Sequence, residues 1–149
     1  MKNDRITGGA IAGIIGAVVQ NIYGQIVKGI GLTDVAFVDF AKVIAFGKPV
    51  PGTISFISGL LAHLTLGMIF GTLFALIVMK TSSKYFLFKC IGYGAALWFI
   101  TLGLGSIFKL PLFVGILPVP QLTTFVGAQA FGLATGYSLK IIQDKTSLV

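Results

Sequence analysis

Charged residues in this chain are confined to the gaps between four long uncharged stretches. From the N-terminus, these stretches contain 22, 31, 19 and 30 residues and lie between Arg5 and Lys28, Lys48 and Lys80, Lys89 and Lys109, and Lys109 and Lys140. The hydrocarbon core of a bilayer is ~30 Å thick and takes about 20 helical residues to cross. Each stretch is therefore long enough to span a membrane, and four spans leave no room for a soluble domain.

The composition indicates the same class of protein. Apolar residues make up 56% of the chain and charged residues only 10%, whereas about 25% of an ordinary soluble domain is charged. The net charge is +7, but the basic residues flank apolar stretches and form no stripe, so we expect no nucleic-acid partner. The lipid bilayer is the expected partner. The single cysteine, Cys90, is expected to pack as a small apolar residue.

These patterns predict an all-α membrane protein with one transmembrane domain over residues 1–149. Transmembrane helices are expected at about 6–27, 52–79, 86–108 and 121–142. The first apolar run is longer than that of a cleaved signal peptide, and no small-residue cleavage site follows it. We therefore interpret it as a transmembrane helix.

Basic residues in the connections predict the orientation, because cytoplasmic loops carry more lysine and arginine. One side has Lys2, Arg5, Lys80, Lys84, Lys89, Lys140 and Lys145, and the other has Lys28, Lys42, Lys48 and Lys109. Seven basic residues against four place both termini in the cytoplasm.

The long connection after the first span predicts a short amphipathic helix at about 34–46, with Thr33 or Asp34 as its N-cap. Its apolar arc includes Phe37 and Phe40, opposite Asp39. Such a helix can lie in the outer membrane interface. The alternative is a loop helix that covers the mouth of the bundle.

A proline motif suggests two tandem parallel helical hairpins. Pro49-Val50-Pro51 recurs as Pro118-Val119-Pro120, each copy just before an apolar stretch. At the same offset, three further identities follow, which are Phe56 with Phe125, Leu64 with Leu133, and Gly67 with Gly136. Parallel repeats of this kind occur in transporters. The alternative is that proline simply favours the first turn of a helix.

Small residues recur every fourth position in three of the predicted spans. Such faces let helix backbones approach closely in a membrane. We expect helix contacts at seven glycines: Gly9, Gly13, Gly59, Gly67, Gly71, Gly132 and Gly136. Three such faces provide more small-residue surface than the packing of one helical hairpin requires. This favours a homo-oligomer or contacts with other membrane protein subunits.

A few polar residues inside the spans are candidates for a functional site. These are His63, Gln20, Asn21 and Gln129. Ionisable residues within a membrane are often functional. The alternative for His63 is a neutral ring bonded to a neighbouring helix, and the amides can equally serve as hydrogen-bonding links between helices.

Several kinds of chemistry are not expected. All four acidic residues lie outside the spans, so paired carboxylates within the membrane are excluded. One histidine and one cysteine make no credible single-chain zinc site or nucleophile pair. We therefore expect no enzyme activity, no metal and no cofactor.

The glycine-rich run GGAIAGIIG at 8–16, the segment DVAFVDF at 34–40 and the four-span length make the chain similar to small uncharacterised multi-pass proteins of bacterial cytoplasmic membranes. The resemblance implies a place in the cytoplasmic (inner) membrane. It implies no activity and no functional residue.

Two functional hypotheses follow. The first is a structural or accessory membrane protein that packs against itself or a larger complex through its glycine faces. The second is a small oligomeric channel or transporter, with His63 and the polar residues of the first span along its path. Quinone or haem binding through His63 and Trp98 is a third possibility, and sparse buried polar groups favour the first.

Overall fold

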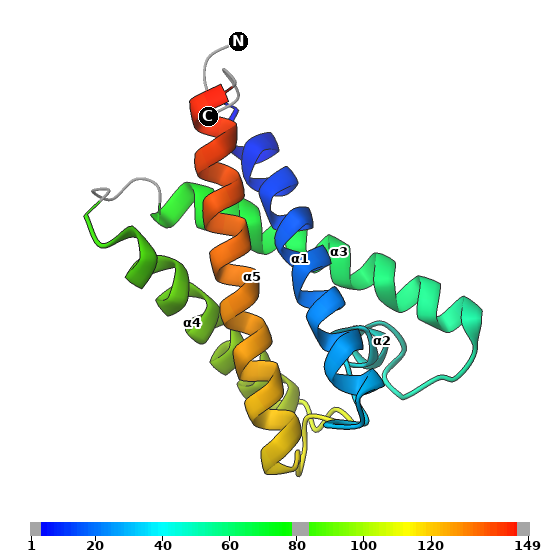
Figure 1. Cartoon of the computed structure of the whole chain (residues 1–149). Coiled ribbons are helices and arrows are strands. Elements are labelled where there is room, and N and C mark those ends of the chain that lie inside the picture. Colours follow the sequence, from blue (N-terminus) through cyan, green and yellow to red (C-terminus); the bar gives the residue numbers. More distant parts are fainter. Residues whose placement is uncertain (1–3, 79–83, 146–149) are drawn as a thin grey trace.

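The computed structural model describes residues 4–78 and 84–145, and in this part of the chain helices are joined by turns and connections, without strands. Its five helices are α1 (Arg5–Gly29), α2 (Phe37–Phe46), α3 (Thr53–Ile77), α4 (Phe86–Ile107) and α5 (Pro118–Lys145) (Figure 1). The all-α prediction is confirmed, and each helix lies where the hydropathy pattern predicts one. Met79, Lys2 and Lys80, which the span and orientation predictions used, lie outside the described residues, as does the side chain of Lys145.

Within the described residues, three helices are long and apolar enough to cross a membrane: α1, α3 and α4. This marks the chain as a multi-pass membrane protein. The fifth helix does not meet the same measure, because Gln129 and several threonines lie among its apolar residues. Helix α5 lies against α1 and α4, and a helix covered by others has less need of apolar side chains on every face.

Helix α1 is central to the bundle. It packs against α3 on one face and α5 on another, and α4 packs against α5 (Figure 1). Helices α1 and α5 run side by side in opposite directions, so the beginning of α1 and the end of α5 lie at one end of the bundle. At the N-terminus of α1, Asp4 accepts a hydrogen bond of 2.9 Å from the backbone N–H of Thr7 and caps the helix.

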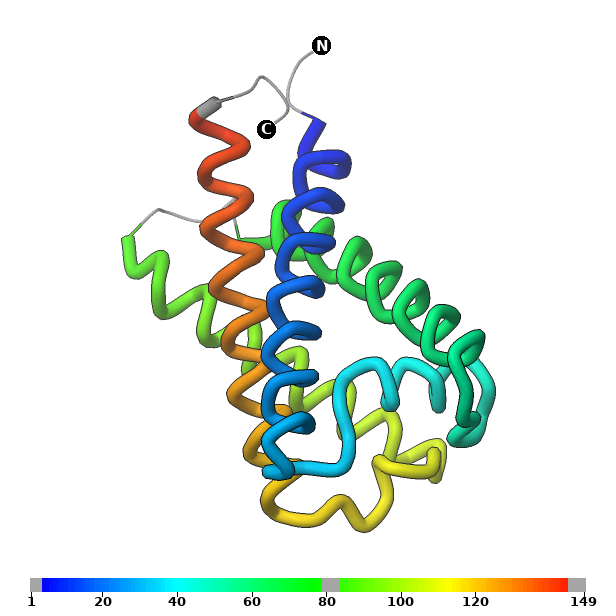
Figure 2. Tube along the Cα trace, turned by 45° about the vertical axis from the view of Figure 1, so that its right-hand side comes forward, coloured from blue at the N-terminus to red at the C-terminus, as the bar shows by residue number. Residues whose placement is uncertain are grey.

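Helices α3 and α4 are held together at one end and diverge towards the other (Figure 2). At the joined end, the Tyr93 hydroxyl donates a hydrogen bond of 2.5 Å to the carbonyl of Phe70, and its ring meets Phe74 edge-on at 5.1 Å. At the open end, α2 packs against α3 and its Phe40 meets Phe113, from the α4–α5 connection, at 5.0 Å. Helix α2 therefore bridges α3 and the α4–α5 connection at this end.

The short helix begins later than predicted. Its N-cap is Ala36, so the prediction of Thr33 or Asp34 as the cap is wrong. The Thr33 hydroxyl instead accepts a bond of 3.3 Å from the Val35 N–H and closes a turn before the helix. Four residues of α2 are buried, namely Val38, Phe40, Ala41 and Val43. These contacts favour the cover over the bundle mouth, the alternative to a helix lying in the interface.

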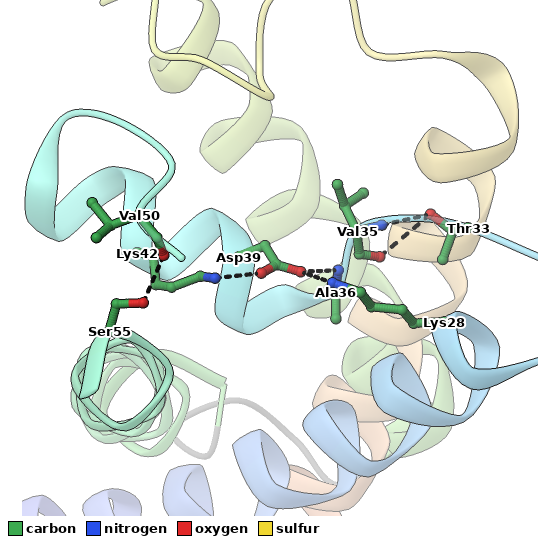
Figure 3. Close-up of polar contacts among 8 residues, drawn as sticks. All are labelled: Lys28, Thr33, Val35, Ala36, Asp39, Lys42, Val50 and Ser55. Carbon is green, nitrogen blue, oxygen red and sulfur yellow. Dashed lines mark hydrogen bonds and ion pairs between the residues drawn. The ribbon is translucent and has the colours of Figure 1, made fainter. Parts of the chain in front are cut away.

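A charged cluster fastens α2 to α1 (Figure 3). Asp39 lies 2.7 Å from Lys28 of α1 and 2.7 Å from Lys42, and accepts a bond of 2.9 Å from the Ala36 N–H. Burial raises the pKa of Asp39, but the hydrogen bonds from Lys28, Lys42 and the Ala36 N–H outweigh it and hold the pKa below its usual value. Asp39 is therefore a charged anchor for the first long connection.

The two proline motifs occupy different positions. Pro118 and Pro120 lie in the first turn of α5, whereas Pro49 and Pro51 precede α3, whose N-cap is Gly52 with φ of +103°. Proline at a helix start needs no donor there, which explains the second copy without a repeat. The first motif, Pro49-Val50-Pro51, is followed by Gly52, whose positive φ is a backbone conformation that favours glycine.

Candidate functional site

A chamber lies where all five helices converge. Its wall is formed by Ala17 and Gln20 of α1, Phe37, Phe40, Ala41 and Ile44 of α2, His63, Leu66, Gly67 and Phe70 of α3, Leu97, Trp98, Thr101 and Leu102 of α4, Phe113, and Thr124, Ala128 and Phe131 of α5. The chamber has a volume of about 100 Å³. It lies at the open end, where α2 packs against α3 and its Phe40 meets Phe113 of the α4–α5 connection.

His63 lies in the wall of this chamber and is only 7% exposed. Its Nε2 lies 3.3 Å from the carbonyl oxygen of Ala17 in α1. A carbonyl only accepts, so Nε2 carries the proton and donates, which leaves Nδ1 as an acceptor. Among the described residues, Nδ1 has no hydrogen-bond partner. The ring also stacks on Phe37 at 5.9 Å.

Gln20 is the second polar side chain of the wall that the sequence predicted. It is 8% exposed, and no hydrogen bond to its side-chain amide is found within residues 4–78 and 84–145. The amide oxygen and nitrogen are not fully enclosed, so a group inside the chamber can reach them. Gln20 therefore presents two amide donors and one carbonyl acceptor to the chamber, and Nδ1 of His63 is a second acceptor.

Asn21 and Gln129, the other two predicted polar residues, are not in the wall. The Gln129 amide nitrogen donates a bond of 3.3 Å to the carbonyl of Phe125 within α5. The side-chain oxygens of both residues are buried without a partner in the described part of the chain. The structure thus brings His63 and Gln20 together and leaves Asn21 and Gln129 apart.

Three further wall residues carry a polar atom. The sequence did not single out Thr101 and Thr124, and it named Trp98 only for the quinone or haem alternative. The Trp98 Nε1–H donates a bond of 3.2 Å to the Thr124 hydroxyl, linking α4 to α5. The Thr124 hydroxyl in turn donates a hydrogen bond within α5, and the carbonyl oxygen of Pro120 lies 2.9 Å from it. A tryptophan in the middle of an apolar span was the one sequence signal for this side of the chamber.

Four of the predicted glycines lie where α1 crosses α3. A Cβ built on Gly9 would lie 2.7 Å from the carbonyl oxygen of Gly71, and one on Gly13 would overlap the carbonyl oxygen of Gly67. Real Cβ atoms do not approach other atoms so closely. The two backbones are therefore in direct contact, as small-residue faces allow in membrane helices.

The other three glycines lie in different contacts of the same chain. A Cβ on Gly132 would overlap the Cys90 carbonyl oxygen in α4, and one on Gly136 would overlap the Cys90 sulfur. A Cβ on Gly59 would overlap the side chain of Lys42 in α2. All seven predicted glycines thus face the chain's own helices.

The described residues offer no metal site, since no three His, Cys, Asp or Glu side chains among them are close enough to hold an ion. The chamber presents nitrogen and oxygen atoms for hydrogen bonding and an aromatic and aliphatic surface.

The chain matches no known family model, no curated protein and no solved structure.

Proposed function

We propose that the chain is a structural or accessory membrane protein of the bacterial cytoplasmic membrane. In this proposal, it crosses the bilayer four times with both termini in the cytoplasm, and associates with itself or with other membrane protein subunits. No enzyme activity is part of the proposal. The observation that carries it is an uncovered face of small and aromatic residues on α4.

Two features of α5 support a fourth span. With 28 residues it is as long as α1, which has 25, and it lies antiparallel beside α1 (Figure 1). About 20 helical residues suffice to cross a bilayer. Its less apolar composition is compatible with a span because α1 and α4 cover much of it.

Single-cysteine labelling tests this topology. In a Cys90→Ala background, Lys84→Cys should react with an impermeant maleimide only from the cytoplasmic side, and Val114→Cys only from the outside, because both side chains are exposed in connections at opposite ends of α4. The measurement compares intact cells with inverted membrane vesicles. Unmodified protein is the control, since Cys90 is buried. Labelling of both positions from one side would contradict the proposed topology.

The glycines of α1, α3 and α5 are covered within the chain, so association through them is not what we propose. Helix α4 instead leaves Gly92, Ala96, Phe99 and Gly103 on one face, since these positions fall within about 60° on a helical wheel. A Cβ on Gly92 or Gly103 would meet nothing within 4 Å, and Phe99 is 72% exposed. Large and small residues that alternate on one face can interlock with a second copy.

Particle mass in mild detergent tests the association. The unmodified protein should elute as an oligomer, and the double variant Gly92→Ile/Ala96→Ile should elute as a monomer, because two branched side chains hold the helices apart. Size-exclusion chromatography with light scattering measures the mass. Ala45→Ile, on the exposed side of α2, is the control and should stay oligomeric. An unmodified protein that is monomeric and without partners would refute the proposal.

The two-hairpin interpretation has one point of support. Gly67 and Gly136, which align at the offset between the two proline motifs, each contact the first helix of their own hairpin, at Gly13 and Cys90 respectively. We include the parallel repeat in the proposal on this basis.

A channel or transporter is the second candidate, and the placement of His63 and Gln20 in one chamber favours it. The remainder of the wall is mainly apolar, which is unsuited to an ion path. The structural role is therefore the better supported of the two.

A further inference from the structure

The exposed wall residues place the opening of the chamber on the side where α2, α3 and α4 meet. One end is closed by Tyr93 and Phe70, which join α3 to α4, and the other by the contact of Phe40 with Phe113. Between these ends α3 and α4 diverge (Figure 2), and the wall residues Leu66 of α3 and Leu97 of α4 are partly exposed, while Ile44 of α2 is 44% exposed. Helices α3 and α4 are both apolar enough to span a membrane, so this opening faces the hydrocarbon of the bilayer.

The chamber contains polar groups that the chain itself does not satisfy. Gln20 has no side-chain partner in the described part of the chain, and neither does Nδ1 of His63. Buried polar groups in native proteins are nearly always hydrogen-bonded. A wet cavity would satisfy them from an aqueous end, whereas an opening beside the apolar helices α3 and α4 admits a lipid-like group.

The charge of the wall limits the kind of ligand. None of its 18 residues is a lysine, arginine, aspartate or glutamate. A charged group would enter without a counter-ion, and the cost of moving an unpaired ion out of water is several kcal/mol or more. The groups that fit are therefore uncharged, with an atom that can both donate and accept a hydrogen bond.

The size of the chamber limits how much of a ligand it holds. Its volume of about 100 Å³ is of the same order as the ~150 Å³ apolar cavity that holds a benzene molecule. That space accommodates the polar end of a lipid-like molecule but not its whole chain. The chain must then leave through the opening beside α3 and α4.

We propose that the chamber binds the hydroxyl end of an uncharged single-chain amphiphile drawn from the bilayer, such as a long-chain alcohol or a monoacylglycerol. The hydroxyl hydrogen can be donated to Nδ1 of His63, and the hydroxyl oxygen can accept from the Gln20 amide. Trp98 and Phe37 add aromatic surface beside it. This inference does not depend on the proposed self-association, and it holds for a monomer as well.

Photo-crosslinking in phosphatidylcholine nanodiscs tests the proposal. The probe is a long-chain alcohol with a diazirine close to its hydroxyl. Mass spectrometry should locate its adducts on wall residues of α3 and α4 that face each other, and unlabelled alcohol should compete them away. The corresponding alkane and fatty acid, without a hydroxyl and with a charged end respectively, should compete at least tenfold more weakly. Adducts spread over the outer faces of all helices would overturn the proposal.

A matched pair of variants isolates the amide. Gln20→Leu should weaken competition by the alcohol by roughly tenfold, the value of one hydrogen bond, while competition by the alkane stays as in the unmodified protein. Gln25→Leu removes a glutamine of the same helix that is not in the wall, and should change neither. Equal competition by alcohol in both variants would overturn the role of Gln20. If Gln20→Leu does not fold, the adduct map and the three competitors on the unmodified protein still decide the proposal.

Discussion

Replacement of Gly13 by isoleucine is expected to destroy the contact between α1 and α3. A Cβ at this position overlaps the carbonyl oxygen of Gly67 and lies 2.8 Å from the Cα of Gly71, so backbone must move and no flexible side chain can give way. Overpacking of a core costs about 1–3 kcal/mol where side chains can adjust. Against two helix backbones, we expect a loss of at least about 4 kcal/mol in the free energy of unfolding, the range of the most damaging single substitutions.

The measurement is reversible unfolding in mixed detergent micelles, followed by the fluorescence of Trp98, the only tryptophan. Gly29→Ile is the control, because a Cβ on this glycine at the end of the same helix meets nothing within 4 Å. It should leave the midpoint of unfolding nearly unchanged. Equal midpoints for the two variants would show that the α1–α3 crossing is not as close as described.

Replacement of Asp39 by asparagine is expected to detach α2 from α1. Asp39 lies between two lysines at 2.7 Å each, and the Lys42 side chain is only 14% exposed. Removal of one partner of a buried ion pair leaves the other charge uncompensated. Since this cluster is only partly buried, we expect a loss of about 2 kcal/mol in the free energy of unfolding. Asp34→Asn, an exposed aspartate of the same connection, should have little effect.

The same cluster predicts a dependence of stability on pH. The pKa of Asp39 is lower in the folded protein than its usual value, so the folded state favours the charged carboxylate. Its contribution is fully present above the unfolded pKa of about 3.9 and is lost as the pH falls through the lower folded pKa. Unfolding midpoints measured from pH 6 downward, for unmodified protein and Asp39→Asn, should therefore converge below about pH 4. A constant difference down to the lowest pH would contradict this origin.

The sequence predicts the helices of this protein well, because apolar length and the position of charges are local properties. The short helix was expected, and only its first residues were placed wrongly, since Asp39 rather than Thr33 or Asp34 bonds the N–H at its start. Proline in the first turn of α5 extended that helix beyond its predicted start at 121. These errors concern how a terminal turn satisfies its backbone groups, a choice that hydropathy does not encode.

The chamber could be predicted only in part. His63 and Gln20 are unusual residues for apolar spans, and the sequence singles them out. That they share one cavity, while Asn21 and Gln129 do not, depends on which faces of α1, α3 and α5 turn towards it. These orientations follow from contacts such as the link from Tyr93 to Phe70 and that of Phe40 with Phe113, which join residues far apart in the chain. Likewise, four-residue spacing marks a glycine as a contact but does not name the helix that covers it.

The position of α1 between α3 and α5 has a consequence for biosynthesis. The ribosome makes α1 before the other four helices. When α3 enters the bilayer, α1, with which it packs through glycines, is therefore already there. Helix α4 packs chiefly on α5, which is made last. Until α5 is inserted, α4 therefore lies in the bilayer without the helix that it contacts most. One wall of the chamber is then missing until translation of α5 is finished. Nascent chains that stop before α5 would present an unfinished bundle to membrane proteases, and completed chains would not.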